Sequence, residues 1–93
     1  MTPQPFERRE VVVVNRHGLH ARPVMQFVDL ASKYDAVITV HKGELVIDGR
    51  EPMEMMLLEA VQGTRLIVTA RGEDAKAAAD ALADLVRRGF DED

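Results

Sequence analysis

A run of four valines, Val11–Val14, most tightly limits what this chain can fold into. β-Branched side chains lose more rotamer freedom in a helix than in a strand, so the run predicts a strand over residues 9–15. Gly18 interrupts that pattern, and apolar residues then recur at the spacing of an amphipathic helix beginning at Ala21. The helical stripe consists of Val24, Phe27, Val28 and Ala31.

The remaining sequence alternates between short strands and helices. Strands are expected over residues 37–40, 45–47 and 65–70, and helices over residues 52–60 and 74–88. The order β-α-β-β-α-β-α predicts an α+β open-faced sandwich, in which a four-stranded antiparallel sheet carries three helices on one face. The 93 residues are sufficient for one domain, with a loose lead-in over residues 1–8 and a frayed acidic tail over residues 90–93.

The composition excludes several classes of function. With 12 basic and 16 acidic residues the net charge is −4, which argues against nucleic-acid binding. No cysteine is present, so disulfides and thiolate metal sites are excluded. Residues 1–6 have no apolar core of signal-peptide length, and the longest apolar run is too short to span a membrane, so a soluble cytoplasmic domain without membrane contact is expected. A monomer is the simplest expectation, and the oligomeric state stays open.

His20 lies between the Gly18 turn and the first turn of the predicted helix. The unpaired N–H groups of a first helical turn and the helix dipole attract anions, and Arg22 adds a fixed positive charge. A neutral imidazole is a nucleophile toward phosphorus and also a good leaving group. Serine, aspartate or asparagine caps a helix better than histidine does, so the choice of His20 favours a functional role.

The segment Gly18-Leu19-His20-Ala21-Arg22-Pro23 resembles the active-site signature of the HPr family, the histidine-containing phosphocarriers of the bacterial phosphoenolpyruvate-dependent sugar phosphotransferase system. The resemblance implies that His20 is phosphorylated on Nδ1 and that Arg22 stabilises the phosphoryl group. The main-chain N–H groups of Ala21 and Arg22 would help to hold it. Enzyme I would be the donor and enzyme IIA domains the acceptors, with no metal or cofactor on this chain. Such a carrier is a protein substrate more than a stand-alone enzyme.

The same resemblance assigns a partner-docking surface and a control point around the second predicted helix. The docking residues would be Pro52, Met53, Met56 and Leu57. Met55 and Leu58 are expected to point inward, whereas the exposure of Met53 and Met56 stays open. Many family members have a regulatory serine just before this helix, and Glu51 occupies that position here. Glu51 either supplies a permanent negative charge in place of a phosphate or serves only as the N-cap of the helix.

Two other functions stay open at this point. A regulatory module of the same fold would use phosphorylated His20, or only its docking face, to control a partner protein. A small-ligand-binding domain would use the anion site without phosphorylation. A metal site at His17 and His20 is disfavoured because two imidazoles alone are too few ligands.

Overall fold

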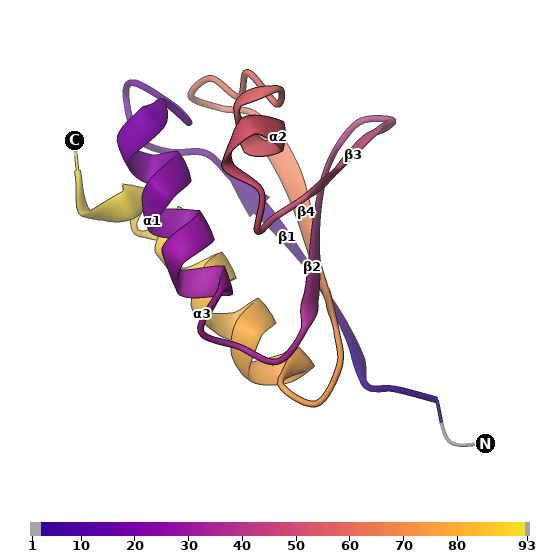
Figure 1. The fold of residues 1–93 in the computed structure, drawn as a ribbon. Helices are drawn as coiled ribbons and strands as arrows, with labels where there is room; N and C mark the ends of the chain where they lie inside the picture. Colours follow the sequence, from indigo (N-terminus) through magenta and orange to yellow (C-terminus); the bar gives the residue numbers. More distant parts are fainter. Residues whose placement is uncertain (1–2, 93) are drawn as a thin grey trace.

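Four strands form one antiparallel sheet in the order β1-β4-β2-β3, and the structure, a computed structural model, describes residues 3–92 (Figure 1). The strands are β1 (Phe6–Val12), β2 (Val37–Lys42), β3 (Leu45–Asp48) and β4 (Arg65–Arg71). The helices are α1 (Ala21–Ala31), α2 (Pro52–Met56) and α3 (Ala75–Arg87), followed by a 3-10 turn over Gly89–Asp91. The element order is the one expected from the sequence.

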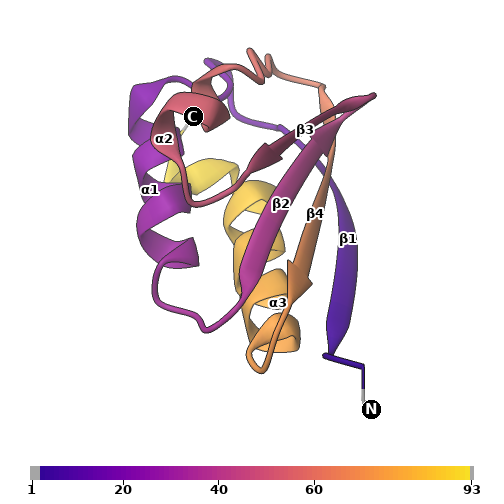
Figure 2. The ribbon, with the colours of Figure 1, turned by 45° about the vertical axis from the view of Figure 1, so that its right-hand side comes forward.

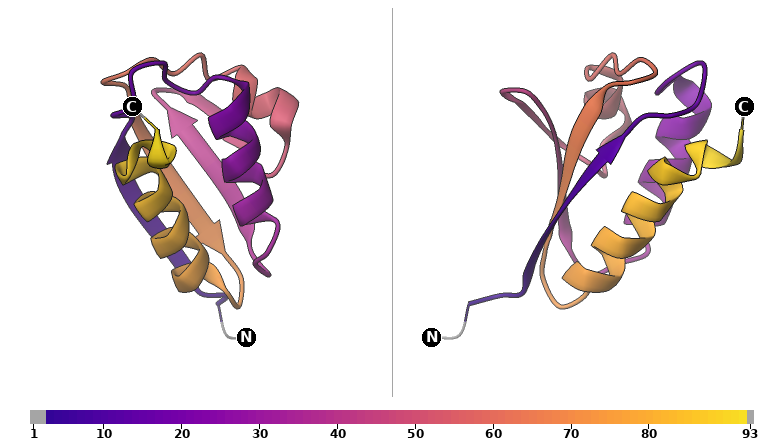
Figure 3. Two further views of the ribbon diagram at one scale, coloured as in Figure 1. Left: turned by 90° about the vertical axis from the view of Figure 1, so that its left-hand side faces the viewer. Right: turned by 180° about the vertical axis from the view of Figure 1, so that it is seen from behind.

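All three helices lie on the same face of the sheet, with α1 and α3 side by side across it (Figures 2 and 3). The buried stripe of α1 predicted from the sequence is confirmed, since Val24, Phe27, Val28 and Ala31 are all buried. The alanine-rich face of α3 allows close packing on β1 and β4. The opposite face of the sheet is open and carries exposed apolar residues such as Val37 and Val46. The predicted α+β open-faced sandwich is therefore confirmed.

The first strand begins earlier in the chain than the valine run predicts. β1 starts at Phe6 and pairs residue by residue with β4, from Phe6 opposite Arg71 to Val12 opposite Arg65. The predicted strand over residues 9–15 was wrong at both ends, and the loose lead-in predicted over residues 1–8 was wrong for residues 6–8; residues 1–2 lie outside the described residues. Four consecutive charged residues, 7–10, hid the start of this strand; on an edge strand all four can stay at least partly exposed, so the alternation of apolar and polar residues is missing.

Helix α2 is shorter than the predicted segment 52–60. It ends at Met56, because the next N–H groups bond three residues back, from Leu57 to Glu54 and from Leu58 to Met55. Glu59 has a positive φ of 45° and terminates the turn. Propensity alone favoured a longer helix, but Leu58 and Ala60 are buried and set the path of the chain.

The expectation of a frayed acidic tail over residues 90–93 was wrong for residues 90–92; Asp93 lies outside the described residues. Phe90 is buried with only 1% of its surface exposed, and it holds the 3-10 turn against the body of the protein. Gly89, Phe90 and Asp91 all have positive φ, so the chain reverses its direction after α3. This reversal brings the C-terminal segment alongside α1 (Figure 1).

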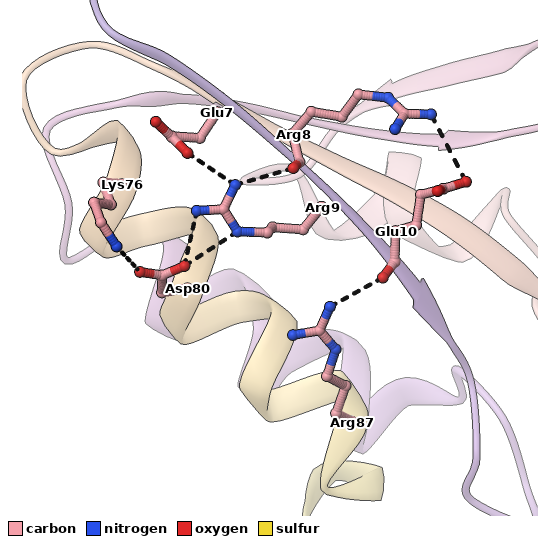
Figure 4. Close-up of polar contacts among 7 residues, drawn as sticks. All are labelled: Glu7, Arg8, Arg9, Glu10, Lys76, Asp80 and Arg87. Atoms are coloured by element: carbon pink, nitrogen blue, oxygen red, sulfur yellow. Dashed lines mark hydrogen bonds and ion pairs between the residues drawn. The ribbon is translucent and has the colours of Figure 1, made fainter.

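A group of charged side chains joins β1 to α3 (Figure 4). Arg9 donates to Asp80 Oδ1 from Nε at 3.1 Å and from Nη2 at 2.9 Å, and it also pairs with Glu7 at 2.8 Å. Lys76 approaches the other oxygen of Asp80 at 2.7 Å. We call Glu7, Arg9, Lys76 and Asp80 the β1–α3 ion cluster.

Candidate functional site

His20 is the N-cap of α1, and its side chain makes no capping hydrogen bond. Its carbonyl accepts the first hydrogen bond of the helix, from Val24 N–H at 3.1 Å. The side chain keeps 42% of its surface exposed, so a partner protein can reach the imidazole. The placement predicted from the sequence, between a glycine turn and the first turn of a helix, is therefore the observed one.

The backbone and Arg22 supply positive potential beside His20. Because the helical hydrogen bonds begin at Val24, the N–H groups of Ala21 and Arg22 have no acceptor within α1, and Pro23 has no N–H. Arg22 is exposed and lies in the same first turn. These are the groups at which an anion site was expected from the sequence, and N–H groups and a positive charge at a helix start attract anions.

A carboxylate that was not anticipated from the sequence holds the imidazole in place. Glu92 Oε1 lies 2.9 Å from His20 Nε2 and also accepts a hydrogen bond of 2.9 Å from Asn15 Nδ2. Asn15 is buried, and the same amide nitrogen donates to Gly18 O at 2.8 Å. We call His20, Glu92 and Asn15 the His20 cluster.

The two hydrogen bonds change the acidity of Glu92. The bond from His20, and then the bond from Asn15, hold the pKa of Glu92 below its ordinary value of 4.5 because both stabilise the charged carboxylate. The positive charge of Arg22 acts in the same direction. Glu92 is therefore ionised throughout the neutral pH range.

Glycine is required at the turn before His20. Gly18 has a φ of +64°, and a Cβ at this position would collide with the carbonyl oxygen of Ala60. The neighbouring Leu19 N–H donates to the same oxygen at 2.9 Å. The loop that carries His20 is thus packed directly against the segment that follows α2.

That packing brings the expected docking residues to the same end of the molecule as His20 (Figure 1). Met53, Met56 and Leu57 are exposed, with Met53 at 75% and Leu57 at 61%, while Pro52 is half-buried. The prediction that Met55 and Leu58 point inward is confirmed, since neither exposes more than 1%. The question left open for Met53 and Met56 is answered in favour of exposure. Met53, Met56 and Leu57 are thus exposed apolar side chains at the end of the short helix α2.

Glu51 is the N-cap of α2. Its carboxylate accepts a hydrogen bond from Met53 N–H at 3.4 Å, and Pro52 occupies the first turn. The structural alternative considered from the sequence is therefore present, and it does not conflict with a regulatory role for the charge.

His17 lies near His20 but makes no close contact with it. The two rings are 6.1 Å apart between centroids and nearly perpendicular, and His17 is exposed. Within residues 3–92 no three histidine, aspartate or glutamate side chains gather in a way that suits a metal ion. None of the helices over the same residues is long and apolar enough to cross a membrane.

Comparison with known proteins identifies the family. Residues 7–88 match the family model described as the phosphorylation site of the HPr component of the phosphotransferase system. The chain belongs to the HPr family. It is a phosphocarrier of the phosphotransferase system, and this membership implies enzyme I and enzyme IIA proteins as partners.

Individual relatives of this HPr-family protein match over nearly their full length. The phosphocarrier protein NPr of Shewanella violacea is 38% identical over 84 residues, which cover 90% of this chain and 92% of the relative. The phosphocarrier protein HPr of Pseudomonas aeruginosa is 37% identical over 84 residues, covering 89% and 93%. The crystal structure of HPr-C-His from Thermoanaerobacter tengcongensis superposes with a TM-score of 0.90 at 34% identity, covering 94% of this chain and 98% of that one.

Proposed function

We propose that His20 is the residue of this phosphocarrier that accepts the phosphoryl group from enzyme I and passes it to an enzyme IIA-type acceptor. The observation that carries the proposal is a half-exposed imidazole at the start of α1 that caps no N–H group. A histidine used only for structure would be replaced at little cost by a residue that caps the helix.

The neighbours of His20 have complementary roles in this proposal. Arg22 and the N–H groups of Ala21 and Arg22 hold the phosphoryl oxygens through charge-assisted hydrogen bonds. These groups are few and exposed, so they orient the phosphoryl group without burying it. A carrier needs such moderate holding, because an interaction that favours the bound state too strongly slows transfer to the acceptor.

The test uses phosphoenolpyruvate and enzyme I from the same organism. We expect intact-mass spectrometry to detect one phosphate that is labile in acid and stable in base. The phosphate should be absent in His20→Ala and present in the matched control His17→Ala. A phosphate that persists in His20→Ala, or that never forms in the unmodified chain, would refute the assignment.

The apolar surface of Pro52, Met53, Met56 and Leu57 is proposed as the docking site for both partners. Methionine side chains repack readily, which suits a surface that binds several proteins in turn. Leu57→Glu should raise the KM of enzyme I for this protein about tenfold, because it places a charge in the centre of the contact. Val46→Glu is the matched control, since Val46 is comparably exposed but lies on the open face of the sheet. Equal effects of the two substitutions would exclude this docking surface.

Glu51 is proposed to supply permanently the negative charge that a phosphorylated serine supplies elsewhere in the family. Its charge is smaller than that of a phosphate, which is about −1.5 to −2. Phosphotransfer from enzyme I should therefore be faster in Glu51→Gln, which loses the charge, and also in Glu51→Ser. Unchanged rates in both variants would leave Glu51 only its observed capping role.

The identity of the final acceptor is a separate question. The relatives named NPr and HPr match this chain at 38% and 37% identity, so sequence identity does not separate the two kinds of carrier. A regulatory acceptor is therefore the second candidate beside a sugar-transport acceptor. A cytoplasmic, monomeric carrier remains the prediction from the sequence, and sedimentation of the phosphorylated and unphosphorylated forms tests the oligomeric state.

A further inference from the structure

We propose that Glu92 is a positioning residue for His20, which fixes the proton of the imidazole on Nε2 and so leaves the lone pair of Nδ1 free to receive the phosphoryl group. This inference rests on the proposed role of His20. It adds a side chain from the end of the chain to the transfer site and explains from this structure which ring nitrogen reacts.

The hydrogen bond between Glu92 and His20 determines the tautomer. Glu92 Oε1 lies 2.9 Å from Nε2, and an ionised carboxylate can only accept. Nε2 must therefore carry the proton, and a neutral ring then has its lone pair on Nδ1. Because the two nitrogens point away from each other across the ring, Nδ1 is directed away from the carboxylate. A phosphoryl group on Nδ1 would thus avoid the negative charge of Glu92.

Asn15 makes the position of Glu92 specific. Its amide nitrogen donates to Glu92 Oε1 and to Gly18 O, so both acceptors fix the orientation of the amide. The reverse orientation would place the amide oxygen against two other oxygens. Since Asn15 is only 2% exposed, this orientation is locked inside the loop that carries His20.

The backbone of the C-terminal segment also holds Glu92 in place. Phe90 is buried, and Glu92 N–H donates to Gly89 O at 3.1 Å. The Glu92 side chain is only 16% exposed. The neighbouring acidic residue, Asp91, forms an ion pair with Arg88 at 3.1 Å. Glu92, in contrast, is directed at the imidazole of His20.

The same contact serves both transfer steps. When the phosphoryl group arrives, the Nδ1 lone pair forms the P–N bond while the bond from phosphorus to the donor breaks and its electron pair leaves with the donor. Nε2 keeps its proton, and the carboxylate stabilises the positive charge that develops on the ring. When the phosphoryl group is passed on, a nucleophilic atom of the acceptor protein forms a new bond to phosphorus while the P–N bond breaks and its electron pair returns to Nδ1. The leaving group at phosphorus is then the neutral imidazole of His20, because Nε2 has remained protonated.

The first test measures the tautomer in the unphosphorylated protein by long-range ¹H–¹⁵N correlation spectra of His20. We expect the Nε2–H form alone in the unmodified chain and in Glu92→Asp, where the carboxylate is retained. Glu92→Ala should give a mixture of both tautomers. The matched control is Asp91→Asn, which removes the same charge one residue away and should preserve the Nε2–H form.

The second test phosphorylates the same four proteins chemically with phosphoramidate, which needs no enzyme I. We expect ³¹P and ¹⁵N spectra to place phosphate only on Nδ1 of His20, except in Glu92→Ala, where a fraction appears on Nε2. With enzyme I, Glu92→Ala should accept phosphate about tenfold more slowly, the loss expected for one partly exposed charge-assisted hydrogen bond, and Glu92→Asp should recover most of the rate.

These outcomes separate the inference from the proposed function. An Nε2–H tautomer and a regiochemistry that are both unchanged in Glu92→Ala would overturn the role of Glu92, even if enzyme I still phosphorylates His20. Failure of enzyme I to phosphorylate the unmodified chain would instead refute the proposed function. The tautomer of the unphosphorylated protein would still report on Glu92 in that case.

Discussion

The β1–α3 ion cluster and the His20 cluster have the same arrangement of hydrogen bonds but differ in the chemistry of their donors. Each centres on one carboxylate, Asp80 or Glu92, that is shared by two donors. In the first cluster the donors are an arginine and a lysine, whose charges are permanent near neutral pH. In the second they are a neutral amide and an imidazole, whose other ring nitrogen carries a lone pair that can bond to phosphorus. Only the second arrangement can take part in group transfer.

The two clusters also depend on different parts of the backbone. The β1–α3 ion cluster spans a regular strand and a regular helix, whose own hydrogen bonds fix its members. The His20 cluster joins an irregular loop to the segment after α3 and needs the turn at Gly18. Fixed ion pairs therefore serve the fold, whereas the reactive group lies where partners have access and where the backbone needs individual support.

Gly18→Ala should have the largest effect and should separate the two clusters. The positive φ of Gly18 and the collision with Ala60 predict a loss of about 3 kcal/mol in the free energy of unfolding. Gly43→Ala is the control, because its φ of +58° is similar and nothing lies within 4 Å of the added Cβ; it should cost about 1 kcal/mol. Urea denaturation measures both values. Equal losses would show that the loop yields freely around Ala60.

The NMR signals of the Gly18→Ala protein sharpen the comparison. Resonances of His20 and Glu92 should shift, while those of Arg9 and Asp80 should not. A shift in both clusters would mean that they are coupled through the core.

Arg22→Gln should lower the rate of phosphotransfer about tenfold, because it removes one charge-assisted contact to the phosphoryl group. Arg9→Gln removes an equal charge from the β1–α3 ion cluster and should leave that rate unchanged. Its effect should be a fall of a few degrees in Tm that diminishes at high salt. Rapid-quench kinetics and calorimetry measure the two effects. A slower transfer in Arg9→Gln would mean that net charge, and not position, controls the reaction.

The smallest expected effects are changes in carboxylate acidity. Asn15→Ala should raise the pKa of Glu92 toward 4.5, because the hydrogen bond from the Asn15 side chain is the second-largest cause of the lowered pKa, after the hydrogen bond from His20. Lys76→Gln should likewise raise the pKa of Asp80 toward 3.8, since the bond from Lys76 is the largest cause there. Carboxyl ¹³C titrations measure both. The change at Asp80 should be more sensitive to salt, because Lys76 is charged and Asn15 is not.

The lowered pKa values determine how the free energy of unfolding changes with pH. Each carboxylate stabilises the folded state above its unfolded pKa, at about 4.5 for Glu92, and that contribution disappears as the pH falls through the lower folded value. Asn15→Ala should narrow the pH range over which this contribution is lost, because it brings the folded pKa of Glu92 closer to the unfolded one. A pKa of Glu92 that stays low in Asn15→Ala would assign the lowering to His20 and Arg22.

The sequence predicted those parts of the molecule that depend on local patterns. The stripe of α1, the inward Met55 and Leu58 and the placement of His20 all follow from periodicity or from a glycine and a proline at set positions. The start of β1 was missed because it is fixed by pairing with β4, which lies more than fifty residues away along the chain. Register with a distant strand leaves no local signal.

The partnership of Glu92 with His20 was missed for a related reason. Three acidic residues at the end of a helix are typical of a solvated terminus, and only Gly89 followed by Phe90 hinted that the chain turns back and buries an aromatic side chain. Asn15 and Glu92 are 77 positions apart in the sequence, which places their contact beyond any pattern of spacing. The position of Glu92 is set by the tertiary packing of Phe90, which local sequence propensity does not predict.

The reversal of the chain after α3 makes the start of β1 and the segment around Glu92 unequal as attachment points for a label. A fluorophore or other bulky group attached at Glu92 would lie beside the imidazole and would compete with an approaching partner. The start of β1 lies at the other end of the sheet, away from the loop that carries His20 (Figure 1). Labels intended for kinetic work therefore belong near the start of β1, because a label at Glu92 would itself perturb the reactive site.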